Sequence, residues 1–452
     1  MSVFVPPDTL LPLEVKPPFR HVRGYGYEAL LPEKFEAMGN IVGQSMRSPL
    51  EFCENGKALP VRHAQNIGIW YAGGGHYNHV GRCIYFSLPD NSDPNTNGRR
   101  YTVRAPKALS PQGGRPFPKR VHVVLSHTCN LWCRICREAP FSGPVMEMAL
   151  FDKIAGECFA FATELRLDSG GEILLNNRLP SILRRAAEYG LPIFASSNGM
   201  LLTPKKARLI AESTVHHIQI SVDSPVKETL EWIRRGANFE RIKRGLRNLV
   251  RARKDVGRPF LISIHAAVMR ENVRQLPDLV RFASELGIEG VTACHLFAHD
   301  CMGIDSSCFW SQAEYDDMRA RAIELARSLD SFFYGPQPFA EAAENNCIAG
   351  WCDYPEYGTY INPDGTVMPC CIAPNFPLGV MNTQSFTEIW NGERYEMLRR
   401  TYRTDAPSLA RCKACLVQEH LQDYMAFFSP AHWEKVRRKM EASSHRAQNF
   451  AK

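Results

Sequence analysis

The chain has 452 residues, 44% of them hydrophobic, which is enough for one large core and one or two smaller domains. Its 54 basic and 47 acidic residues give a formal charge of +7, without a basic stripe interleaved with aromatic residues. This pattern argues against nucleic-acid binding. The sequence has no apolar run long enough to span a bilayer and no signal-peptide pattern at its start, so we expect a cytoplasmic protein without a membrane partner.

The cysteines are the unusual feature of the composition. Nine of the 15 fall into two groups, at 129–136 and at 347–371 with 412–415. In a reducing compartment, clustered cysteines indicate a metal site or catalysis rather than disulfides. The isolated ones are instead predicted to be small buried apolar residues, as at Cys53, Cys83, Cys158 and Cys294.

Residues 1–118 are rich in turn-forming residues and contain short strand-like runs at 67–71 and 83–87. They predict a small β-containing N-terminal domain of unknown role. Residues 301–346 are expected to form a connecting segment with one helix over 312–329. Residues 347–416 form a cysteine-rich domain, and 417–452 are expected to form a basic C-terminal helix.

Residues 119–300 alternate strand-like and helical runs. The predicted strands are 121–125, 165–167, 193–195, 218–222, 260–268 and 291–294, and the predicted helices are 147–161, 179–189, 204–212, 239–254 and 273–286. This order is typical of an α/β fold with a parallel sheet and outer helices, either doubly wound or an open barrel. No Gly-x-Gly-x-x-Gly follows the first strand, which weakens a dinucleotide-binding interpretation.

The first cysteine group, Cys129, Cys133 and Cys136, has the spacing Cys-x3-Cys-x2-Cys directly after the first predicted strand. Three thiolates on a short loop can hold three irons of a cubane cluster and leave the fourth iron open for a substrate. The alternatives are a zinc site or three incidental core cysteines. Structural zinc normally takes four protein ligands, and no fourth cysteine follows nearby.

This motif and its position resemble the radical S-adenosylmethionine (SAM) superfamily. The resemblance implies a partial (β/α)6 TIM-like barrel over 119–300, a catalytic 4Fe-4S cluster on these three cysteines, and S-adenosylmethionine as a second cofactor. It also implies an enzyme that cleaves S-adenosylmethionine reductively to a 5′-deoxyadenosyl radical, which abstracts hydrogen from the substrate. An electron donor such as flavodoxin or ferredoxin is then expected as a partner.

The resemblance extends along the barrel. Asp168-Ser-Gly-Gly-Glu172 matches the Gly-Gly-Glu motif of the superfamily, where Gly170 and Gly171 would let the backbone approach the amino group of S-adenosylmethionine and Glu172 would accept a hydrogen bond. The remaining predicted contacts to this cofactor are Asn198, Ser221, Asp223, and Arg234 or Arg235. An ordinary turn at Asn198 and a helix cap at Asp223 are the alternatives.

The second cysteine group resembles the C-terminal auxiliary-cluster domains called SPASM and twitch. The resemblance rests on Cys352, Cys370 and the Cys412-x2-Cys415 pair, with the turn Asn362-Pro-Asp-Gly365 between them. It implies one closed auxiliary 4Fe-4S cluster on Cys352, Cys370, Cys412 and Cys415 that assists electron transfer. Cys371 or Cys347 could replace one of these ligands. A four-cysteine zinc site is the alternative, since zinc ribbons share the Cys-x2-Cys pair.

The motifs leave the substrate open. We expect a small molecule, with sugar-type compounds as the first class. A peptide substrate is the alternative, although the β- and turn-rich residues 1–118 do not resemble the winged-helix leader-binding domain of many peptide maturases. A non-enzymatic iron–sulfur or zinc scaffold is the rival from another class, but it would have no use for an open iron and a Gly-Gly-Glu loop.

Overall fold

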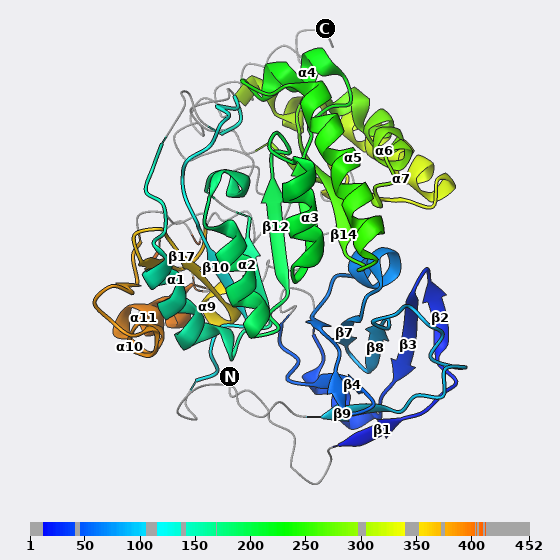
Figure 1. Cartoon of the computed structure of the whole chain (residues 1–452), viewed down its shortest axis with the longest axis vertical. Coiled ribbons are helices and arrows are strands. Elements are labelled where there is room, and N and C mark those ends of the chain that lie inside the picture. Colours follow the sequence, from blue (N-terminus) through cyan, green and yellow to red (C-terminus); the bar gives the residue numbers. More distant parts are fainter. Residues whose placement is uncertain are drawn as a thin grey trace, which may run out of the picture.

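The computed structural model describes residues 12–40, 46–104, 115–136, 142–168, 170–296, 304–339, 352–371, 376–402, 404, 406–409 and 412. Within them, the chain forms a large central sheet flanked by helices and two smaller, mostly antiparallel sheets at the N-terminal end (Figure 1). None of the described helices is long and apolar enough to cross a membrane.

The centre of the fold is a run of seven parallel strands in sequence order. They are β10 (Arg120–Val123), β11 (Glu164–Leu167), β12 (Ile193–Ser197), β13 (Val215–Ser221), β14 (Leu261–Val268), β15 (Gly290–His295) and β16 (Phe332–Tyr334). The first six confirm the predicted alternation and the partial TIM-like barrel. The seventh, β16, comes from the segment that the sequence predicts to be a connection.

Helices cover the outer face of these strands. They are α1 (Met148–Ile154), α2 (Leu179–Glu188), α3 (Pro204–Glu212), α4 (Lys227–Ile233), α5 (Phe239–Val256), α6 (Leu276–Glu285) and α7 (Gln312–Ser328). Helix α5 illustrates why these helices pack against the sheet. Its apolar residues Ile242, Leu246 and Leu249 recur at helical spacing and are all buried. Gly257 ends α5 in the left-handed conformation.

The C-terminal domain extends the same sheet. Strand β17 (Gly358–Ile361) pairs parallel to β10, and β18 (Thr366–Met368) and β19 (Gly379–Val380) follow antiparallel. Helices α9 (Tyr354–Tyr357), α10 (Phe386–Trp390) and α11 (Glu393–Thr401) pack beside them, and the Phe386 ring meets Phe117 edge to face at 5.3 Å between centroids. The C-terminal domain is therefore continuous with the barrel sheet, although the predicted domain boundaries stay predictions.

The N-terminal residues form two small sheets, β1-β9-β4-β5 and β2-β3-β8-β7-β6, around an aromatic core. Their strands are β1 (Leu13–Val15), β2 (Arg20–Arg23), β3 (Gly26–Leu30), β4 (Glu51–Glu54), β5 (Lys57–Ala58), β6 (Val61–Arg62), β7 (His76–Val80), β8 (Cys83–Phe86) and β9 (Tyr101–Arg104). In Figure 1 this blue region lies at the lower right, next to the amino end of β14.

The strand predicted at 67–71 is wrong. Residues Gly68–Ala72 form a short π-helical segment instead. The Trp70 carbonyl accepts a hydrogen bond from the Tyr25 amide at 3.0 Å, and the Trp70 ring packs so closely on Gly26 that a Cβ there would lie 2.5 Å from it. Tertiary packing thus overrides the apolar, β-like composition of this run.

Candidate active site

The predicted functional residues gather at one edge of the parallel sheet. The three cysteines follow β10, the Gly-Gly-Glu motif follows β11, Asn198 follows β12, and Ser221 is the last residue of β13. Because the carboxyl ends of parallel strands meet at one edge, these loops lie side by side there, which is where barrel enzymes place their active sites.

The Gly-Gly-Glu motif is in direct contact with the cysteine loop. The Glu172 amide donates to the Thr128 carbonyl at 2.9 Å, one residue before Cys129. A Cβ added to Gly171 would lie 2.1 Å from the same oxygen, and Gly170 has φ = +92°, which favours glycine. These glycines therefore allow the two loops to approach, in addition to any role toward a cofactor.

Glu172 joins two of the loops through buried hydrogen bonds. Its carboxylate accepts from Ser197 Oγ at 2.7 Å, from the Asn198 amide at 2.7 Å and from the Leu174 amide at 3.0 Å. Burial raises the pKa of Glu172, and these donors oppose that shift. Asn198 in turn donates from Nδ2 to Asn130 Oδ1 at 2.9 Å, and that nitrogen lies 3.7 Å from Cys129 Sγ. Asn198 is thereby positioned beside the first cysteine.

The other side of the cysteine loop is held by the end of α4 and the residues that follow it. The Trp132 amide donates to the Arg235 carbonyl at 3.1 Å, and the Arg134 amide donates to the Ile233 carbonyl at 2.8 Å. Arg234 points inward and forms a buried ion pair with Asp223, with 2.7 Å between Nε and Oδ2. The half-buried Arg235 stays outside that pair.

The donors on the loop suit an iron–sulfur cluster. Cys133 is buried, Cys129 is half-buried and Cys136 is exposed. Burial raises the pKa of the Cys133 thiol to about 11; Arg234 lowers it, and Asp223 and the thiols of Cys136 and Cys129 add to the rise. Within the described ranges no three His, Cys, Asp or Glu side chains surround a single ion, whereas each thiolate of a cubane binds a separate iron.

The second cysteine group is described in part. Cys352 precedes α9, Cys370 follows β18, and the Cys412 amide donates to the Leu409 carbonyl at 2.8 Å. Cys371 is exposed. Cys415, Cys347 and the predicted basic helix over 417–452 lie outside the described residues. The four-cysteine set for the auxiliary cluster therefore stays a prediction.

A polar chain inside the barrel was not predicted. Thr292 Oγ1 accepts from Gln219 Nε2 at 2.9 Å and lies 2.9 Å from His265 Nδ1, and His265 Nε2 lies 3.6 Å from Cys294 Sγ. Cys294, predicted to be a buried apolar residue, has a solvent-accessible side chain in this polar chain, so the prediction of a core residue is wrong, although its place inside the barrel raises the pKa of the thiol to about 11. The signal in the sequence was the alternation of polar with apolar residues along β13 and β14.

Comparison with known proteins agrees with this geometry. The profile of the Radical SAM superfamily matches residues 123–283, and that of an iron–sulfur cluster-binding domain, SPASM, matches residues 352–416. The chain is 24% identical to an AdoMet-dependent heme synthase of Nitratidesulfovibrio vulgaris over 70% of this chain and 89% of the relative. It is also 24% identical to a PqqA peptide cyclase of Bradyrhizobium diazoefficiens over 67% of this chain and 80% of the relative.

Among solved structures, SuiB of Streptococcus suis bound to its precursor peptide SuiA superposes with a TM-score of 0.54 at 16% identity, covering 68% of this chain and 70% of that one. This likeness supports the fold. The two matched profiles show that the chain belongs to the radical SAM superfamily through residues 123–283 and carries a SPASM domain over residues 352–416, and the contact between the cysteine loop and the Gly-Gly-Glu motif agrees with this.

Proposed function

We propose that this radical SAM enzyme abstracts hydrogen from a polar small molecule bound inside the carboxyl end of its barrel, with sugar-type compounds as the first class to test. The observation that carries this proposal is the polar chain from Gln219 to Cys294. When bound, the cluster and S-adenosylmethionine supply the radical chemistry. The protein's own residues orient the substrate and exclude water from it.

The hydrogen bonds along this polar chain determine which of its atoms donate and which accept. The Thr292 hydroxyl donates to the Ile264 carbonyl at 3.1 Å, so its oxygen is an acceptor for Gln219 and His265. His265 then carries its proton on Nδ1, and Nε2 accepts from the Cys294 thiol. A hydroxyl-bearing substrate would find both donors and acceptors along this wall, whereas an apolar one would leave them unpaired.

We assign S-adenosylmethionine contacts to the loops that surround the cysteines. Gly170, Gly171, Asn198 and Ser221 would hold the cofactor, as the resemblance implies. Of the two arginines, we favour Arg235 for the carboxylate, because the Arg234 guanidinium is already paired with Asp223. Asp223 and Glu172 would then act mainly by positioning these loops, since their carboxylates are engaged inside the protein.

A peptide substrate is the second candidate, and the relatives favour it at least as strongly. The named relatives include a PqqA peptide cyclase, and SuiB is seen bound to its precursor peptide. The AdoMet-dependent heme synthase is a relative whose name instead points to a small molecule. The N-terminal sheets lie at the amino ends of the strands, opposite the cysteine loop, which is not where a domain guiding a peptide to that loop would be placed.

A one-electron donor such as flavodoxin or ferredoxin is the partner that the chemistry requires. Arg134 lies over the Trp232 ring at 4.4 Å, next to the exposed Cys136, and Trp232 is itself exposed. A cationic and aromatic surface beside the cluster loop suits an acidic electron carrier.

The proposal is tested with anaerobically reconstituted protein, S-adenosylmethionine and a chemical reductant. Release of 5′-deoxyadenosine tests the enzyme class. Incubation with a panel of sugars and aminocyclitols, and separately with a panel of peptides, is then scored by mass change. A modified sugar-type compound supports the first candidate, and a modified peptide alone would replace it with the second. Cys294→Ser should alter conversion of the substrate, because Cys294 belongs to the polar chain. Cys308→Ser is the control, because Cys308 is a buried cysteine outside that chain.

A further inference from the structure

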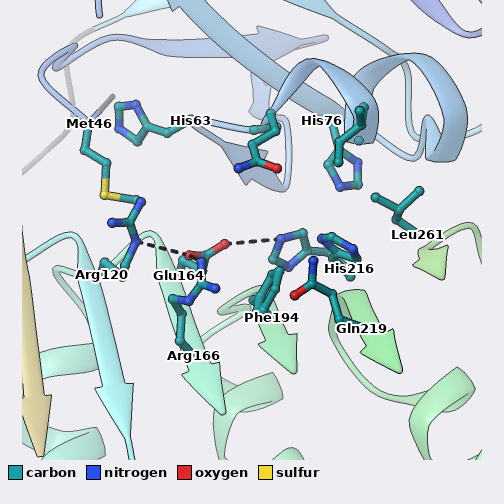
Figure 2. Close-up of a pocket in the computed structure, with 15 residues that line it drawn as sticks. Met46, His63, His76, Arg120, Glu164, Arg166, Phe194, His216, Gln219 and Leu261 are labelled. Atoms are coloured by element: carbon teal, nitrogen blue, oxygen red, sulfur yellow. Dashed lines mark hydrogen bonds and ion pairs between the residues drawn. The ribbon is translucent and has the colours of Figure 1, made fainter. Parts of the chain in front are cut away.

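A pocket of about 160 Å³ lies between the N-terminal sheets and the amino ends of the barrel strands. Arg120 and Glu164 are the first residues of β10 and β11, and His216 is the second residue of β13. The cysteine loop follows the opposite end of β10, so the pocket lies away from that loop, although Gln219, the first residue of the polar chain described above, also lines it. Figure 2 shows His63 and His76 reaching toward it from the N-terminal region, facing the barrel residues.

Buried imidazoles with unsatisfied nitrogens line this pocket. His76 is 3% exposed and His216 is 9% exposed. His76 Nε2, His216 Nδ1 and His63 Nε2 have no hydrogen-bond partner among the described residues. Buried polar atoms are nearly always paired, so three orphaned nitrogens around one cavity indicate a ligand that supplies their partners.

The hydrogen-bond partner of each histidine ring determines whether its other nitrogen faces the pocket as a donor or as an acceptor. His63 Nδ1 lies 3.1 Å from Asn40 Nδ2, a donor, so His63 presents Nε2–H as a donor to the pocket. His76 Nδ1 is bonded to the Gly73 carbonyl and His216 Nε2 lies 3.3 Å from Glu164 Oε1, so both rings present a bare nitrogen as an acceptor. The pocket therefore has a donor end near His63 and an acceptor end near His76 (Figure 2).

Positive charge is concentrated at the donor end. Arg120 is held loosely, with Nε 3.5 Å from Glu164 Oε2 and a second nitrogen 3.9 Å from Asp353 Oδ1, beyond the 2.7–2.9 Å usual for charge-assisted bonds. Burial lowers the pKa of His63 well below its ordinary value, and the positive charges of Lys119, Arg62 and Arg120 lower it further. The Arg120 guanidinium and the Nε2–H of His63 are therefore the donors that an anion would meet at this end, beside the Glu164 carboxylate.

We propose that this pocket binds a small organic oxyanion that also carries a hydroxyl group, such as a hydroxy acid or a hydroxyl-bearing phosphate. The oxyanion would lie on Arg120 and His63, and the hydroxyl would donate to His76 Nε2. The site lies at the amino ends of the strands, shares only Gln219 with the polar chain proposed for the radical substrate, and does not depend on the class of that substrate.

The test is isothermal titration calorimetry of the full-length protein at matched ionic strength. Two pairs of probes are used, phosphate with glycerol 3-phosphate and acetate with lactate. The hydroxyl-bearing member of at least one pair should bind more tightly than its bare partner. Arg120→Gln should weaken oxyanion binding about tenfold or more, and His76→Phe should remove the preference for the hydroxyl-bearing probe. His79→Phe is the matched control, because His79 is equally buried on the same strand, also has an orphaned Nε2, and lies outside the pocket.

Three results would overturn the proposal. These are no binding of any probe to folded wild-type protein, equal binding to the His76→Phe and His79→Phe variants for every probe, and binding of Zn²⁺ with no oxyanion binding. Should Arg120→Gln fail to fold, as judged by circular dichroism, His63→Phe replaces it, because it removes the other predicted donor without touching the Glu164 ion pair.

Discussion

Asp223 and Arg234 form a buried ion pair directly behind the cysteine loop, with 2.7 Å between Oδ2 and Nε and 3.1 Å between Oδ1 and the second guanidinium nitrogen. Asp223 Oδ1 also accepts from the Ala267 amide at 2.9 Å. One carboxylate thus joins the end of β13 and the end of β14 to the segment that pairs with the loop. Arg234 also places a positive charge near Cys133, which lowers the pKa of that thiol against the rise that burial causes.

Replacing Asp223 by alanine should be strongly destabilising. It would leave the Arg234 guanidinium buried and unpaired, and breaking such a pair costs about 3–5 kcal/mol of unfolding free energy. Glu212→Ala is the control, because the Arg208–Glu212 pair is exposed and should contribute less than about 1 kcal/mol. Urea denaturation measures both, and similar small effects would show that the buried pair is not needed for stability.

Gly171 should not tolerate even a methyl group. A Cβ there would lie 2.1 Å from the Thr128 carbonyl, so Gly171→Ala should displace the cysteine loop, and Gly171→Val should do so more severely. We expect lower iron content and weaker S-adenosylmethionine binding in both variants. Gly156→Ala, where a Cβ meets nothing within 4 Å, should leave both properties unchanged. Normal cofactor affinity in folded Gly171→Ala would show that the motif is only a turn.

Acid should destabilise the protein in part through His76. Burial lowers the pKa of His76 from 6.5 to about 3, so below pH 6.5 the unfolded chain binds a proton that the folded chain does not. Stability therefore falls as the pH drops from 6.5 toward 3, by about 2 kcal/mol at pH 5 for this one group. His76→Phe should flatten the change in unfolding midpoint between pH 7 and pH 5, measured without oxyanions. An unchanged slope would show that this ring titrates normally.

The sequence predicted the barrel well because its signals are local. The alternation of apolar strands with amphipathic helices such as 239–254 reports burial directly, and β10 to β15 appear where it indicated. The pairing of β17 with β10 was out of reach, since nothing local in Gly358–Ile361 specifies a partner more than 200 residues away. The motif residues lay at one edge of the sheet as expected, but the contact between Gly171 and Thr128 required the folded loops.

Cys129, Cys133 and Cys136 are predicted to bind the catalytic cluster. Replacing all three by alanine should abolish release of 5′-deoxyadenosine, because no thiolate would remain on the loop, while the absorbance of the C-terminal cluster should persist. Cys53→Ala, a buried cysteine of the N-terminal sheets, is the control and should retain cleavage if the protein folds. Unchanged 5′-deoxyadenosine production in the triple variant would refute this ligand set.

The metal content should be about eight irons per chain in anaerobically reconstituted protein, since the catalytic and auxiliary sites each take a cubane cluster. A zinc site at the C-terminal end would instead give about four irons and one zinc, which elemental analysis distinguishes.

Cys412→Ala distinguishes an electron-transfer cluster at the C-terminal site from a structural zinc. With an electron-transfer cluster there, the variant should still cleave S-adenosylmethionine but fail to convert substrate; with a structural zinc it should misfold, because metal-binding energy is then folding energy. One tightly bound zinc with about four irons in the wild-type protein would refute the auxiliary cluster but would not affect the prediction of the catalytic cluster.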